Sequence, residues 1–152
     1  MSSIPGLRSP YTKTGRLVYF GRMLDKIRLH AAGKLPVEDY APNLGKGFDA
    51  RCCSFLRVNY DDLKARVLAG GESDEQLLAW AEQRGMPRSD EECEVWNGFM
   101  MKRGLRDAAA EILAKRIREG GLEGKPILTM FDYIDFDEGR DPVTARAWES
   151  RD

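Results

Sequence analysis

Four charged residues lie in one segment whose apolar residues recur at helical spacing, and they are the first candidates for a site that binds or reacts. They are Arg22, Asp25, Lys26 and Arg28. The apolar residues fall on two faces of the predicted helix, which indicates that other elements contact it on two sides. A charge in such a position must be paired or hydrogen-bonded, because an unpaired buried charge is costly. These residues therefore form an internal ion network, or they line a cavity that a ligand fills.

Asp25 and Arg28 are three residues apart, the spacing at which two helical side chains lie side by side. We expect them to form an internal ion pair that holds the helix in place. Three acids near the C-terminus, Asp132, Asp135 and Asp137, are candidate partners in a wider network. We favour this network over a ligand site, because structural ion pairs often imitate functional ones.

Two further polar residues extend the candidate set and leave two functions open. His30 follows on the same helix, and Tyr40 lies in the loop behind it. We favour a non-enzymatic module that binds a small anionic ligand or a protein partner through the basic helix. Its candidate ligand-binding residues are Arg22, Asp25, Lys26, Arg28, His30 and Tyr40.

The alternative is a small enzyme that performs acid–base chemistry. It ranks second, because catalytic constellations normally show more than one histidine or a recognisable carboxylate pair. The residues of this acid–base group are Asp25, Lys26, His30 and Tyr40.

Motifs for metals, nucleotides and covalent catalysis are incomplete. The single histidine cannot complete the usual zinc ligand sets, and its spacing to the cysteines does not indicate a Cys–His nucleophile. Gly45–Gly47 lacks the spacing of a phosphate-binding P-loop and follows no predicted strand. Asp135–Gly139 resembles a calcium loop, but its glycine stands where a ligand is needed. We therefore expect no metal and no cofactor. The cysteines are Cys52, Cys53 and Cys93.

Composition and charge restrict the class of protein. The chain has 152 residues, 42% hydrophobic and 32% charged, which fits one helical domain with a charged surface. It has no apolar run long enough to cross a membrane and no secretory signal, and its three cysteines form no disulfide framework, so we expect a cytoplasmic location. Residues 1–34 are basic, but the net charge is −1, so we expect this segment to pack against the acidic segments 72–94 and 132–152 and do not expect a nucleic-acid partner.

Capping signals and glycines divide the chain into helices. Ser73 with Gln76 and Ser89 with Glu92 form two capping boxes, and Pro126 suits a first helical position. No segment alternates long enough to predict a strand. We therefore predict an all-α single domain, residues 1–152, built as an irregular orthogonal bundle of about seven short-to-medium helices, with residues 1–13 and 141–152 less ordered. The predicted helices are 17–33, 48–56, 60–69, 74–84, 90–103, 108–118 and 126–134.

Aromatic residues at helical spacing favour a packed core over a binding pocket. Trp96 shares a predicted helix face with Cys93, Phe99 and Met100, so we expect its side chain to be largely buried. The other aromatic residues considered for such a pocket are Trp80, Phe131 and Tyr133.

The sequence also resembles a known family over most of its length. The most specific part is Leu24–Lys26 with Arg28 and Gly33, and further matches include Phe48–Asp49, Trp96–Asn97, Lys102–Gly104 and Glu138–Arg140. These residues resemble the uncharacterised bacterial family called domain of unknown function 5069. The resemblance implies a bacterial, intracellular helical domain that usually stands alone, and it implies no activity.

Overall fold

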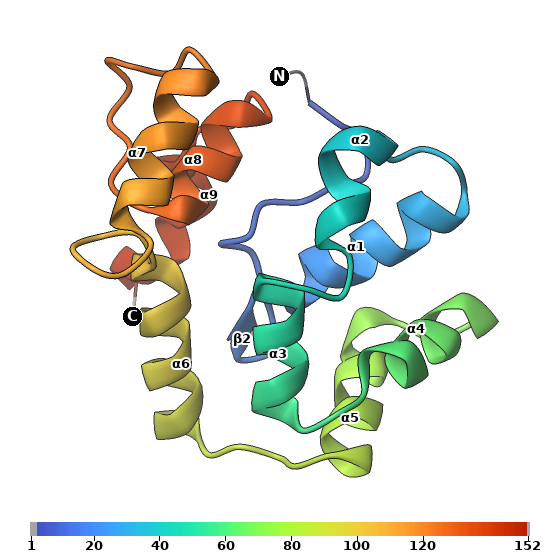
Figure 1. Cartoon of the computed structure of the whole chain (residues 1–152). Helices are drawn as coiled ribbons and strands as arrows, with labels where there is room; N and C mark the ends of the chain where they lie inside the picture. The colour runs from blue at the N-terminus through green and yellow to red at the C-terminus, as the bar shows by residue number, and fades with distance from the viewer. Residues whose placement is uncertain (1–2, 152) are drawn as a thin grey trace.

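The computed structural model describes residues 3–151, and most of that range is helical (Figure 1). The prediction of an all-α fold is confirmed: α1 and α3–α8 correspond to the seven predicted helices, and the four-residue helices α2 and α9 were not predicted. The elements are β1 (Lys13–Thr14), β2 (Leu17–Val18), α1 (Phe20–Ala31), α2 (Val37–Tyr40), η1 (Ala41–Asn43), α3 (Phe48–Leu56), α4 (Tyr60–Ala69), α5 (Asp74–Arg84), α6 (Asp90–Lys102), α7 (Ala110–Glu119), α8 (Met130–Asp137), α9 (Pro142–Ala145) and η2 (Ala147–Arg151).

The first helix begins later than its apolar pattern predicts. Leu17 and Val18 form a strand that pairs antiparallel with Lys13–Thr14, and the sheet has these two strands only within the described part of the chain. Tyr19 then takes a φ of 70°, which is not helical, so that α1 starts at Phe20. A short apolar run suits a strand as well as a helix, and here the hairpin partner decides between them.

Capping boxes predict two helix starts correctly, and a third helix starts at a threonine cap instead of at the predicted proline. Both boxes form, with Ser73 capping α5 and Ser89 capping α6. The prediction for Pro126 is wrong, because α8 begins at Met130, where the Thr129 side chain accepts a hydrogen bond from the Asp132 amide. A capping side chain accepts a hydrogen bond from a free amide at the start of the helix. A proline is compatible with the first turn but makes no such hydrogen bond.

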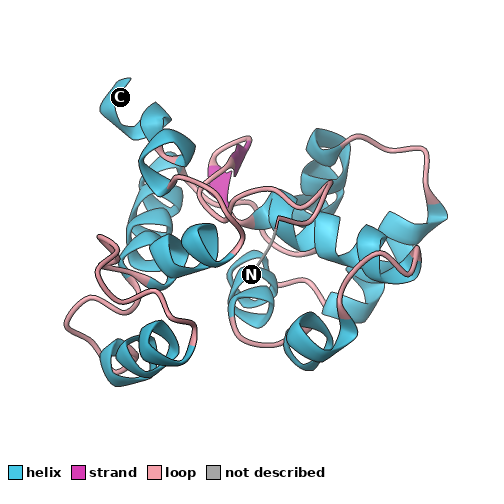
Figure 2. Cartoon of the chain, turned by 90° about the horizontal axis from the view of Figure 1, so that it is seen from above, coloured by secondary structure: helices cyan, strands magenta, loops and turns pink. Residues whose placement is uncertain are grey.

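Helix α1 lies at the centre of the molecule. Every residue from Phe20 to Ile27 is buried, charged residues included, as expected for a helix contacted on two sides. The helices form two groups: α1–α5, called here the N-terminal group, and α6–α9, called the C-terminal group. Figures 1 and 2 show the two groups side by side, with the β1–β2 hairpin between them. Within residues 3–151, no helix combines the length and apolar character that crossing a membrane requires.

The two ends of the described chain pack against each other. Tyr11 is buried, its hydroxyl donates to Asp132, and its carbonyl accepts a hydrogen bond from the Trp148 indole. Leu7 is also buried, so segments expected to be less ordered contribute to the packing. For residues 1–2 and 152, the same expectation lies outside the described residues.

Trp96 packs against the core but is less buried than Cys93 and Met100 of the same predicted face. The side chain is half-buried and stacks on Phe55, with ring centroids 4.8 Å apart. Phe99 on the same helix is 43% exposed, while Cys93 and Met100 face the core. The apolar stripe of α6 is therefore wider than the surface that covers it.

Candidate functional site

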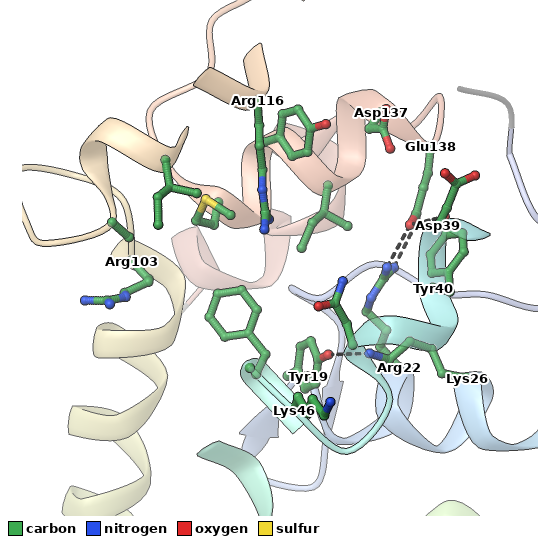
Figure 3. A pocket seen from close by; sticks show the side chains of 18 of the residues that line it. Tyr19, Arg22, Lys26, Asp39, Tyr40, Lys46, Arg103, Arg116, Asp137 and Glu138 are labelled. Atoms are coloured by element: carbon green, nitrogen blue, oxygen red, sulfur yellow. Dashed lines mark hydrogen bonds and ion pairs between the residues drawn. The ribbon is translucent and has the colours of Figure 1, made fainter. Parts of the chain in front are cut away.

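A cleft of about 750 Å³ opens between the two groups of helices, and Figure 3 shows much of its lining. Helices α1, α2 and α3 supply one side, and α7, α8 and Arg103 supply the other. The apolar lining includes Phe48, Ile112, Met130 and Ile134. The cations of the lining are Arg22, Lys26, Lys46, Arg51, Arg103 and Arg116, and the acids are Glu38, Asp39, Asp137 and Glu138.

A buried ion pair joins α1 to the end of α8 at one end of this cleft. The Arg22 guanidinium donates to both oxygens of Glu138, over 2.8 and 2.7 Å, and the Tyr40 hydroxyl donates to the same carboxylate over 2.9 Å. Both charged residues are less than 5% exposed. Burial opposes ionisation of Glu138, but the hydrogen bonds and charge of Arg22 outweigh it and lower the pKa of this carboxyl below its ordinary value.

A second buried cluster lies next to the first, between α1 and α3. Lys26 Nζ is 2.7 Å from Asp49 Oδ1 and donates to the Tyr19 hydroxyl over 2.9 Å. Tyr19 in turn donates to the same carboxylate oxygen over 2.6 Å. Burial lowers the pKa of Lys26 from its ordinary value, although the charge of Asp49 opposes this effect. The positive φ of Tyr19 is an uncommon conformation for a tyrosine, and it occurs where this side chain lines the cleft.

A neighbouring face of α1 carries a different set of contacts. Asp25 accepts two hydrogen bonds from the Arg8 side chain, over 2.8 and 3.0 Å, whereas the Arg28 guanidinium is 3.9 Å away. Arg28 instead lies 2.9 Å from Asp74. The expected Asp25–Arg28 pair is therefore a long contact, and Arg8 is the main partner of Asp25.

The structure separates the sequence-predicted residues, and helix geometry accounts for the place of Arg28. Arg22, Lys26 and Tyr40 line the cleft, whereas Asp25, Arg28 and His30 do not. Lys26 and Arg28 point about 160° apart at 100° per residue. The structure thus does not bring the four residues of the proposed acid–base group together.

The expected acidic partners of the network also differ from those observed. Asp132 pairs with Arg146 and Asp135 with Arg140, while Asp137 lines the cleft. Glu138 takes the place expected for one of them. Across the described range 3–151, no group of three or more His, Cys, Asp and Glu side chains is arranged to hold a metal ion.

Comparison with known sequences identifies the family. A family described as Domain of unknown function (DUF5069) has a sequence model that matches residues 4–140. The chain belongs to this family. The match in this DUF5069 member includes every residue that lines the cleft, from Tyr19 to Glu138, and excludes α9 and η2. No curated protein matches the sequence.

Several residues of the cleft and of the buried ion pairs beside it were not predicted as site residues from the sequence. Asp49 and Glu138 are the carboxylates that neutralise the α1 cations, and both belong to the stretches that carry the family resemblance. The family resemblance was therefore the feature of the sequence that could have pointed to these two carboxylates. The sequence did not mark Lys46 and Arg116 as site residues. Both are exposed, and the sequence alone does not distinguish an exposed cation that lines a cleft from one that faces bulk water.

Proposed function

We propose that the protein is a non-enzymatic binding module that holds a small ligand with an anionic group and an apolar part in the cleft. The observation that carries this proposal is the position of Arg116. Its exposed side chain extends from α7 into the cleft (Figure 3), whose lining also includes the apolar side chains of Ile112 and Met130. A guanidinium next to apolar surface suits an anion whose remainder is hydrophobic.

Free cations distinguish this cleft from a purely structural gap. Arg22 and Lys26 already have buried carboxylate partners. Among the described residues, Lys46, Arg51 and Arg116 form no ion pair, although Arg51 lies over the Phe99 ring. These cations remain available to an incoming anion.

The size and shape of the cleft favour a small ligand over a protein partner. Small-molecule sites are concave and hold about 300–1,000 Å³, a range that includes this cleft. A stable protein partner covers about 800 Å² on each side, commonly over a flatter surface. We propose a cytoplasmic location for this binding, which the free thiols of Cys52, Cys53 and Cys93 support.

The proposal is tested with anilinonaphthalene sulfonate, an aromatic anion whose fluorescence rises in apolar surroundings. We expect saturable binding to the intact chain, weakened at least about fivefold by Arg116→Glu, since the variant replaces attraction with repulsion. Arg118→Glu is the matched control, because Arg118 is exposed on the same helix and does not line the cleft. Equal affinity in the two variants contradicts the proposal.

A further inference from the structure

The cleft carries opposite charges at its two ends. Figure 3 shows Asp39, Asp137 and Glu138 together on one side and Arg103 on the other, with Arg116 and Lys46 between them. Helix α2 and the end of α8 therefore form an acidic end.

The other acids of the acidic end differ from the buried Glu138 in their ion-pair partners. Glu138 has the guanidiniums of Arg22 and Arg140 as partners. Asp39 and Asp137 form no ion pair with any described residue. Burial raises the pKa of Asp137, and the charges of Glu138 and Asp39 raise it further, while the positive charge of the chain's N-terminus opposes the rise without cancelling it. An additional cation placed beside Asp39 and Asp137 would stabilise both of these carboxylates.

A ligand with only negative charge would fill this cleft poorly. Its far end would desolvate Asp39 and Asp137 without offering them a partner, which opposes binding. A ligand with only positive charge would meet the same difficulty at Arg116 and Lys46. A ligand with both charges, joined by an apolar chain, satisfies both sets of residues and can cover apolar lining residues such as Ile134 and Met130.

We infer that the ligand of this cleft is a zwitterion, with an acidic group against Arg116 and Lys46 and an amine against Asp39 and Asp137. Chemically it belongs to the class of amino acids or short peptides that carry an amine at some distance from a carboxylate. This inference rests on the proposed binding function and narrows its ligand class.

Three dansyl probes that share one fluorophore separate these cases. Nα-dansyl-lysine carries a carboxylate and a distant ammonium, the dansyl amide of aminohexanoic acid carries the carboxylate alone, and dansylcadaverine carries the ammonium alone. In fluorescence titrations of the full chain, we expect dansyl-lysine to bind about tenfold more tightly than either single-charge probe, because it makes both sets of ion pairs.

Matched variants assign each charge to its end of the cleft. The double variant Asp39→Asn/Asp137→Asn should weaken dansyl-lysine about fivefold, and it should bind the carboxylate probe at least as tightly as the unmodified chain does. Arg116→Gln should weaken both of these probes. Asp61→Asn is the control, because Asp61 is exposed on α4 and does not line the cleft; it should change none of the three affinities.

The outcomes distinguish this inference from the binding function beneath it. If the carboxylate probe binds as tightly as dansyl-lysine and the acidic-end variant changes nothing, the zwitterion inference is overturned and the anion-binding proposal stands. If dansylcadaverine is the tightest probe and Arg116→Gln has no effect, both are overturned. If no probe binds, both are overturned as well.

Discussion

The two faces of α1 hold their charges in opposite ways. On the cleft face, Arg22 and Lys26 are at most 6% exposed, and each has a carboxylate oxygen at 2.7 Å. On the other face, the arginines that contact Asp25 are 31% and 38% exposed. One helix of 12 residues thus carries ion pairs shielded from water on one face and ion pairs partly exposed to water on another.

This difference separates stability from function. A half-solvated pair costs little to form and contributes little, because water screens it. Burying an ion pair removes both charges from water, and their mutual attraction offsets much of that desolvation cost. Two apolar residues of similar volume often give the folded protein equal stability. Stability alone therefore does not explain the ion pairs on the cleft face, which supply polar groups to the lining of the cleft.

The largest effect is expected from Glu138→Gln. The substitution leaves the Arg22 guanidinium buried without a counter-charge, and arginine does not lose its proton. We expect a loss of about 3–5 kcal/mol in the free energy of unfolding, measured by urea denaturation. Glu123→Gln, at an exposed position, should change it by less than about 0.5 kcal/mol. A loss below about 1 kcal/mol for Glu138→Gln would show that the cleft face is solvated like the other.

A smaller, pH-dependent effect is expected from Asp49→Asn. This substitution leaves Lys26 without its carboxylate partner. Because lysine can lose its proton, we expect a smaller loss of about 2 kcal/mol in the free energy of unfolding at pH 7. The folded-state pKa of Lys26 already lies below its ordinary 10.5 through burial, and removing the charge of Asp49 lowers it further. Between the folded and unfolded pKa values the unfolded chain binds more protons, so stability rises with pH.

The deficit of Asp49→Asn relative to the wild type should therefore shrink as the pH is raised from about 7 to about 9. Urea denaturation of both proteins across this range measures it. A deficit that stays constant or grows would mean that Lys26 keeps its proton, and that its environment resembles the solvated face.

The smallest effects belong to the half-solvated face. A double-mutant cycle of Asp25→Asn with Arg8→Met should give a coupling of about 1 kcal/mol, because two hydrogen bonds join these side chains. The cycle of Asp25→Asn with Arg28→Met should give less than about 0.5 kcal/mol, because the Asp25–Arg28 contact is 3.9 Å long. Thermal or urea unfolding of the single and double variants supplies both values. A larger coupling to Arg28 than to Arg8 would reverse the assignment of partners.

Local signals in the sequence determined much of the fold. Capping boxes depend on residues three apart, so Ser73 and Ser89 predict their helix starts without tertiary context. Apolar residues on two faces likewise predict that α1 is central, because that pattern is a property of the helix alone. The same helical spacing marked Arg22 and Lys26 as charges in need of partners.

Tertiary structure alone decided which partners they have. Arg22 meets Glu138 across 116 positions of the chain, and Asp25 meets Arg8 rather than its helical neighbour Arg28. Local spacing says which side chains can meet within one helix, but the contacts between helices depend on how the whole chain packs. The cleft has the same origin, because α1–α3 and α7–α8 enclose it only after the two groups of helices come together. No local pattern records that arrangement. The sequence therefore identified the charges on α1, and the fold decided which of them face the cleft.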